Sequence, residues 1–146
     1  MLMVTKILLT VATLGYSGIP TFFDWNKSHA TNPTWTGHAR YHVVWQVSSY
    51  DFVALIALFL IWTAGDDAAR LWTPALLALA IFAGFWIALA TRPIYGGILQ
   101  DQVNGVPAIH YNLFGRKFSI DANVSLFTPL MLISVMATGL VWILTA

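Results

Sequence analysis

Residues 71–90 form a run of twenty positions without a charged side chain, and Arg70 and Arg92 bracket the run. As an α-helix rising about 1.5 Å per residue, this segment is roughly 30 Å long, which matches the hydrocarbon thickness of a bilayer. The segment therefore predicts a transmembrane helix and a lipid bilayer as the medium in which the chain folds.

The composition supports this prediction. Hydrophobic residues make up 58% of the 146 positions and charged residues only 9%, against about 45–50% and about 25% in soluble domains.

The residue types also exclude some functions. The net charge is only +1 and the basic residues are scattered, so the sequence has no basic patch of the kind that binds nucleic acid. The chain has no cysteine, which excludes thiol catalysis and thiolate metal sites. It also has no glutamate, so every side-chain carboxylate belongs to one of six aspartates.

Three further apolar stretches, residues 1–23, 46–65 and 124–146, complete a set of four spans. We therefore expect an all-α fold, a polytopic four-helix transmembrane bundle that forms a single domain over residues 1–146. The first stretch has an alternative interpretation, because Lys6 followed by an apolar run is also typical of a signal peptide.

The connections between these spans are unequal in length. A tight turn at residues 66–69 follows the second span, whereas residues 24–45 and 91–123 are long connections. Alternating residues at 108–112 and 116–120 predict a small β-hairpin within the second long connection. With four spans, both long connections lie at the same membrane surface, together with all four histidines. We expect function at this surface, because loops on a rigid scaffold commonly carry it.

The basic residues predict an orientation. Five of them lie beside the long connections, against Lys6 and Arg70 at the opposite surface. The five are Lys27, Arg40, Arg92, Arg116 and Lys117. The positive-inside rule then places the long connections on the cytoplasmic side of the membrane. We expect a multi-pass protein of a bacterial plasma membrane.

Two histidines are placed for joint chemistry. Asn32 followed by Pro33 is typical of a helix N-cap with proline at the first helical position, so we expect the second helix to begin there. His38 and His42 then lie four residues apart on one helix face, a spacing at which two imidazoles can bind a metal ion. The third ligand in this hypothesis comes from elsewhere in the chain, and the candidates are His110, His29, Asp24 and Asp121. Proton transfer without a metal, and plain hydrogen bonding at the headgroup level, are the alternatives.

Asp51 is an ionisable residue inside the second span. It lies roughly 7–8 Å below the surface if the apolar core begins near Gln46. An ionised carboxylate there costs several kcal/mol unless it is paired or hydrated. We consider two roles, a catalytic carboxylate and an ion-pair partner for Arg40 or Arg92. The helical wheel places Asp51 nearly opposite His38, so the two side chains do not both face the centre of one bundle.

Two residues at the ends of the spans also have alternative roles. Arg92 is either a snorkelling anchor or a group that binds substrate. Asp121 is either the N-cap of the fourth helix or a catalytic carboxylate. The sequence has no G-x-S-x-G, Walker A or G-x-G-x-x-G motif, which argues against serine hydrolysis, nucleotide hydrolysis and dinucleotide redox chemistry.

The pattern Asp24-Trp25-Asn26, followed by Asn32-Pro33-x-Trp35-x-x-His38-Ala39-Arg40-x-His42, resembles an uncharacterised family of small four-span membrane proteins of bacteria and fungi. The resemblance covers roughly a third of the chain. It implies the same four-span architecture and transfers no activity to the chain.

These observations favour a membrane-embedded enzyme that isomerises, hydrates or cyclises a small lipophilic molecule by acid–base chemistry. His38, His42, Asp24 and Asp51 are the candidate catalytic residues. Arg40, Arg92, Trp35 and His110 are the candidate substrate-binding residues. A version with one bound zinc, iron or copper ion uses His38, His42 and His110. The alternative is a non-catalytic subunit, or a component that binds haem or pigment, within a homo-oligomer or a larger membrane complex.

Overall fold

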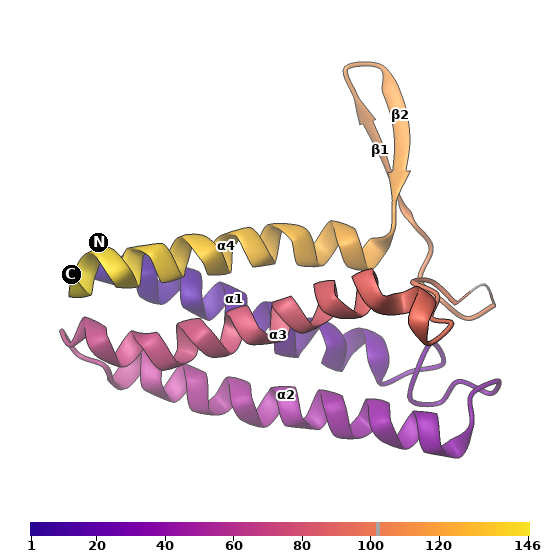
Figure 1. Ribbon diagram of the computed structural model, residues 1–146, viewed down its shortest axis with the longest axis horizontal. Helices are drawn as coiled ribbons and strands as arrows, with labels where there is room; N and C mark the ends of the chain where they lie inside the picture. The colour runs from indigo at the N-terminus through magenta and orange to yellow at the C-terminus, as the bar shows by residue number, and fades with distance from the viewer. Residues whose placement is uncertain (102) are drawn as a thin grey trace.

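Four helices long and apolar enough to cross a membrane dominate the computed structural model, which describes residues 1–101 and 103–146. They are α1 (Leu2–Asp24), α2 (Gly37–Thr63), α3 (Trp72–Thr91) and α4 (Ala122–Thr145). The helices lie side by side, with both chain ends at one end of the bundle and both long connections at the other (Figure 1). This confirms the predicted all-α bundle, and the chain is an integral, multi-pass membrane protein.

Helix α1 is the centre of the bundle. It contacts each of the other three helices. Of an apolar 18-residue stretch in each helix, 44% is buried in α1, against 22% in each of the others.

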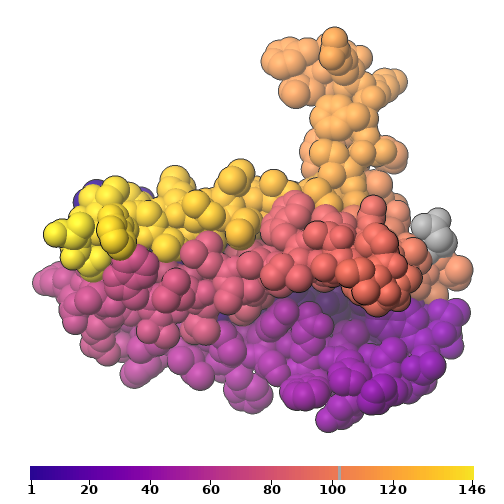
Figure 2. All heavy atoms as spheres, in the orientation of Figure 1, coloured from indigo at the N-terminus to yellow at the C-terminus, as the bar shows by residue number. Residues whose placement is uncertain are grey.

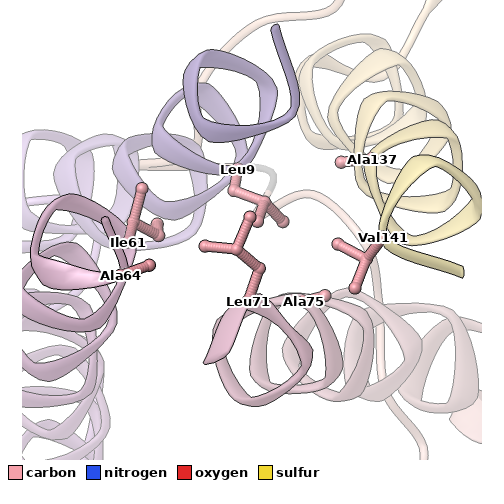
Figure 3. Close-up of a cluster of buried hydrophobic side chains, with 7 residues drawn as sticks. All are labelled: Leu9, Ile61, Ala64, Leu71, Ala75, Ala137 and Val141. Atoms are coloured by element: carbon pink, nitrogen blue, oxygen red, sulfur yellow. The ribbon is translucent and has the colours of Figure 1, made fainter. Parts of the chain in front are cut away.

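Two hydrophobic clusters form the core. The first contains residues from all four helices and from the turn before α3 (Figure 3). Its members are Leu9, Ile61, Ala64, Leu71, Ala75, Ala137 and Val141. A second cluster surrounds Tyr16 and Phe82, whose rings meet edge to face at 6.2 Å. Large apolar side chains on the outside, such as Phe52 and Phe59 of α2, face the lipid.

Side-chain caps explain where α2 and α4 begin. Asp121 accepts hydrogen bonds from the N–H groups of Asn123 (2.8 Å) and Val124 (3.4 Å), which confirms it as the N-cap of α4. The predicted start of the second helix is wrong, because the N-cap of α2 is Thr36, whose hydroxyl accepts from Ala39 N. The buried Asn32 side chain accepts instead from the backbone N–H of Thr34, within a turn.

The turn between α2 and α3 is held by the two cations at that end of the bundle. Lys6 Nζ donates to the carbonyl of Gly65 at 2.7 Å, and Arg70 Nη1 donates to the carbonyl of Thr63 at 2.9 Å. A short 3₁₀ helix, η1 (Ala68–Leu71), then leads into α3. Both cations satisfy carbonyls at the C-terminus of α2, where the helix dipole favours positive charge.

We expect Lys6→Met to lower the free energy of unfolding by about 1–2 kcal/mol, because it leaves the carbonyl of Gly65 without its charged donor. The measurement is reversible unfolding in bicelles. Lys27→Met, which removes an exposed lysine at the other end of the bundle, is the matched control. Equal stability of the two variants would show that the Lys6 hydrogen bond contributes nothing.

The second long connection contains a two-stranded antiparallel hairpin, β1 (Ile109–Leu113) and β2 (Arg116–Ile120). A second 3₁₀ helix, η2 (Arg92–Ile94), links α3 to this connection. The hairpin matches the sequence prediction to within one residue. It stands away from the bundle, across the direction of the helices (Figures 1 and 2).

Candidate functional site

The first loop, residues 25–36, folds back over the end of α1. Its backbone hydrogen bonds run from Ala30 N to Asp24 O (2.8 Å) and from His29 N to Asn26 O (3.1 Å). The Asn26 side chain accepts from the backbone N–H of Ser28 at 2.8 Å, which is an Asx turn. These turns bring together Asp24, Ser28 and His29, which are separated by up to five positions in the sequence.

Asp24 and His29 form a carboxylate–imidazole pair. Asp24 Oδ1 lies 3.3 Å from His29 Nδ1, and no other carboxylate lies this close to a basic side chain among the described residues. Ser28 Oγ lies 2.7 Å from the same nitrogen. Both contacts involve Nδ1, so the three residues do not have the order of a serine-hydrolase triad, in which the hydroxyl contacts the other ring nitrogen.

The partners of Ser28 indicate which histidine tautomer is present. Its hydroxyl also lies 2.8 Å from Phe23 O and 2.8 Å from Asn26 Oδ1, both of which only accept hydrogen bonds. We therefore assign the Ser28 hydrogen to one of these acceptors and the proton of neutral His29 to Nδ1. His29 Nε2 then carries a lone pair, and in the described part of the chain no side chain or backbone group hydrogen-bonds to it. This arrangement is that of a general base oriented by a carboxylate.

Trp35 borders this pair. Its ring meets the His29 ring edge to face, with the centroids 5.2 Å apart. The His29 side chain is 35% exposed and that of Asp24 is 25% exposed, so a ligand can reach both from the membrane surface.

Asn32 joins the two long connections. Its side chain is fully buried, donates to Ser28 O at 3.0 Å and donates to Asp101 Oδ2 at 3.2 Å. Its oxygen accepts from the Thr34 hydroxyl at 2.8 Å and from Asn104 Nδ2 at 3.4 Å. The loop that carries His29 is thus fixed to the segment around Asp101.

Hydrogen bonds also stabilise the ionised form of Asp101. Backbone N–H groups of Asn104 and Val103 donate to it at 2.9 Å and 2.7 Å. Together with donors from Asn32 and Trp35, they lower the pKa of the Asp101 carboxyl.

Comparison of the chain with protein-family models, curated proteins and solved structures finds no match. The resemblance to small four-span membrane proteins of bacteria and fungi therefore stays a prediction.

His38 and His42 do lie on one face of α2, with their Nε2 atoms 3.0 Å apart. That face points out of the bundle, since both histidines are exposed. His42 stacks on the exposed Trp45 ring at 5.9 Å, and Tyr41 packs beside both rings. We call His38, Tyr41, His42 and Trp45 the outer aromatic strip.

Asp51 faces the opposite way, into the bundle. Both of its carboxylate oxygens accept from the Thr21 hydroxyl of α1, at 2.8 Å and 2.9 Å. The predicted ion pair with Arg40 or Arg92 is not found among the described residues, and Thr21 is the partner instead. The wheel argument was right that Asp51 and His38 point in different directions, and it is Asp51 that points inward.

The remaining predicted site residues lie apart from these groups. Arg40 is half-buried in the first turn of α2, and Arg92 is exposed at the end of α3. His110 lies on the hairpin, opposite Ser119. The hairpin projects from the α4 side of the bundle and α2 forms the other side (Figure 1), so His110 does not lie beside His38 and His42. Within residues 1–101 and 103–146, no group of three or more histidines and acids is placed to hold a metal ion.

Our sequence interpretation named His29 only as an alternative third metal ligand, not as a catalytic base, and did not identify Thr21. The signal for Thr21 is a run of hydroxyl residues every four positions in α1, at Thr13, Ser17 and Thr21. Such a run lies on one helix face and predicts a polar partner for a carboxylate within the membrane.

Proposed function

We propose that this protein is a membrane-embedded enzyme that moves a proton on a small lipophilic substrate, with His29 as the catalytic base and Asp24 as the residue that orients it. The observation that carries the proposal is the placement of His29 Nδ1 between Asp24 and Ser28, which leaves Nε2 as a proton acceptor.

The pair supports isomerisation most directly. His29 Nε2 takes a proton from a carbon next to a carbonyl or an alkene, and the electron pair moves into the neighbouring π system. The Asp24 carboxylate stabilises the imidazolium that forms. The imidazolium then gives a proton to a different carbon of the substrate, so the overall reaction has no other reactant. Because the imidazolium N–H exchanges with water, the proton that is returned can come from the solvent. In hydration, His29 instead takes a proton from a water molecule as its oxygen adds to an alkene conjugated with a carbonyl, and the imidazolium gives a proton to the neighbouring carbon. In cyclisation, the electron pair left on carbon forms a ring bond to a carbonyl carbon of the same substrate, and the carbonyl oxygen takes the proton.

The position of the pair favours a substrate that comes from the bilayer. Asp24 is the last residue of the α1 span, and the neighbouring Trp25 is exposed beside it. A lipophilic molecule can place its apolar part in the hydrocarbon and its reacting group at this surface. Arg40 and Arg92, at the same end of the bundle, are the candidates to bind a polar or anionic group of the substrate, and Trp35 is the candidate to contact its apolar part.

We place the loops in the cytoplasm of a bacterial plasma membrane. Lys27, Arg40, Arg92, Arg116 and Lys117 lie at the loop end. At the other end, Lys6 and Arg70 are engaged with the carbonyls that end α2. The charge asymmetry supports the cytoplasmic side for the loops.

A second candidate function is a non-catalytic subunit of a larger membrane complex. The outer aromatic strip favours it, because these exposed rings and imidazoles offer a surface to a partner protein, a pigment or a haem. A metal ion on His38 and His42 would take its other ligands from water, lipid or a second copy of the chain.

Exchange of hydrogen at carbon tests the proposed enzyme without knowledge of the substrate. The purified protein in nanodiscs is incubated in D₂O with a total lipid extract of the native host. Mass spectrometry then identifies any lipid that gains deuterium at a non-exchangeable carbon. We expect one lipophilic compound to gain deuterium with the protein and none with empty nanodiscs. A wild-type protein that labels no compound would contradict the proposal.

A further inference from the structure

The hairpin β1–β2 has two chemically different faces. In the antiparallel register, Ile109 lies opposite Ile120, Tyr111 opposite Phe118, and Leu113 opposite Arg116. Opposite residues share a face, so this face is apolar except for Arg116, which lies next to the tip. The other face carries the pairs His110–Ser119 and Asn112–Lys117, which are polar.

The apolar face is not covered by the bundle. Tyr111 and Phe118 stack on each other at 5.5 Å, yet they are 37% and 43% exposed. Leu113 is 56% exposed and Phe114, at the tip, is 96% exposed. A two-stranded hairpin is only marginally stable in water by itself, so an uncovered face of this kind requires a surface to pack on.

The turn at the tip is a second unusual feature. Phe114 has φ +51° and Gly115 has φ +79°, as a two-residue type I′ turn requires. Asparagine is favoured at the first of these positions, whereas phenylalanine is unfavourable in the left-handed region. Folding alone gives no reason for a strained aromatic residue that is almost fully exposed, and an external contact does.

The attachment of the hairpin identifies the surface. Strand β2 ends at Ile120 and α4 begins at Ala122, so the base of the hairpin lies where a membrane span begins. The hairpin runs across the helix direction (Figure 1) and therefore along the plane of the membrane. Five-residue strands extend about 17 Å, which carries the tip outside the bundle (Figure 2) and over the surrounding lipid.

We propose that the hairpin lies on the bilayer, with its apolar face in the headgroup–acyl boundary and Phe114 as its anchor. Tyrosine and phenylalanine are suited to this layer, since amphipathic and aromatic side chains gather there. Arg116 and Lys117, beside the tip, reach lipid phosphates, and phosphatidylglycerol strengthens this contact. The inference concerns a lipid-binding surface and does not depend on the reaction proposed above.

The absence of cysteine makes a direct test straightforward, because each introduced cysteine is a unique labelling site. Tyr111→Cys and Leu113→Cys report on the apolar face, and Asn112→Cys and Ser119→Cys are the matched controls on the polar face. Each variant is labelled with bimane and placed in nanodiscs of phosphatidylcholine with a minority of phosphatidylglycerol. Quenching is compared between a lipid with a nitroxide near its headgroup and aqueous iodide.

We expect severalfold stronger lipid quenching at positions 111 and 113 than at 112 and 119, and the reverse order with iodide. Equal iodide quenching at all four positions would overturn the proposal, because the hairpin would then lie in water. Protection of positions 111 and 113 from both quenchers would also overturn it, since a protein would then cover the face.

Phe114→Asn separates lipid contact from folding. The substitution supplies the residue that the turn favours and removes the aromatic ring. We expect lipid quenching at Leu113→Cys to fall severalfold, with no decrease in the midpoint of thermal unfolding. Unchanged lipid quenching would show that Phe114 is not the anchor.

Discussion

His29→Gln lowers the rate of carbon–deuterium exchange in the lipophilic substrate by about 100- to 10,000-fold, the range that a positioned general base contributes. Glutamine keeps a polar side chain of similar reach but has no basic nitrogen. The expected loss is in the exchange rate at saturating substrate, measured by mass spectrometry in nanodiscs. The thermal midpoint of the variant should stay close to that of the wild type, because the His29 side chain is only partly buried.

Two aspartate variants distinguish loss of the carboxylate beside His29 from the general effect of removing one negative charge. Asp24→Asn removes the carboxylate that stabilises the imidazolium, so we expect a clear but smaller loss of exchange. Asp66→Asn makes the same chemical change in an exposed turn at the other end of the bundle, and its rate should match the wild type.

A histidine variant tests whether the outer aromatic strip takes part in the reaction. The double variant His38→Ala/His42→Ala should affect exchange less than His29→Gln does. The opposite order would transfer the catalytic role to the outer aromatic strip.

The fold was predictable because the bilayer imposes strong rules. An apolar run such as residues 71–90 must be helical to satisfy the hydrogen bonds of its backbone in lipid. Two spans separate the long connections, so both connections lie at one membrane surface. The hairpin was predictable from alternation alone, since residues 109–120 change between apolar and polar at almost every step. None of these inferences requires knowledge of distant contacts.

The candidate site was harder to predict, because it depends on how a loop folds. The pair Asp24–His29 exists only because two turns reverse the chain after α1. Asn32 before Pro33 has the same local signature in a helix cap and in a turn. What decides between them is the burial of Asn32 against Asp101, a residue 69 positions away.

Asn32→Asp should uncouple the two long connections and lower the free energy of unfolding by about 2–4 kcal/mol at neutral pH. The change is nearly isosteric, but it replaces an N–H donor with an oxygen. The carbonyl of Ser28 then loses its buried donor, which by itself costs about 1–3 kcal/mol. The new carboxylate also faces Asp101, whose nearest oxygen lies 3.2 Å from Asn32 Nδ2. Unfolding of the variant and the wild type in bicelles measures the difference.

The stability deficit of Asn32→Asp should depend on pH in a direction that identifies its cause. In the wild type the pKa of Asp101 is lowered, so its contribution to stability is complete above the ordinary carboxyl pKa, about 4, and is lost as the pH falls through the lowered value. In the variant, two facing carboxylates raise the pKa of the pair. Protonation then relieves their repulsion, and the deficit against the wild type should shrink as the pH falls toward 4.

Asn123→Asp is the matched control for this experiment. Asn123 is exposed in the first turn of α4, where a negative charge is favourable. Its stability should stay near that of the wild type, with no relief in acid. A deficit of Asn32→Asp that is the same at every pH would contradict the proposed contact between the new carboxylate and Asp101.

The central position of α1 has a consequence for how the protein is made. Ribosomes produce α1 first and α4 last of the four helices, yet Leu9 of α1 packs in a cluster that includes Val141 of α4. Until α4 enters the membrane, the side of α1 around Gly15, which lies against Leu130 of α4 in the finished bundle, has no permanent neighbour. Assembly is therefore completed late, and the insertion machinery or transient lipid contacts must shield the first helix while the others are synthesised.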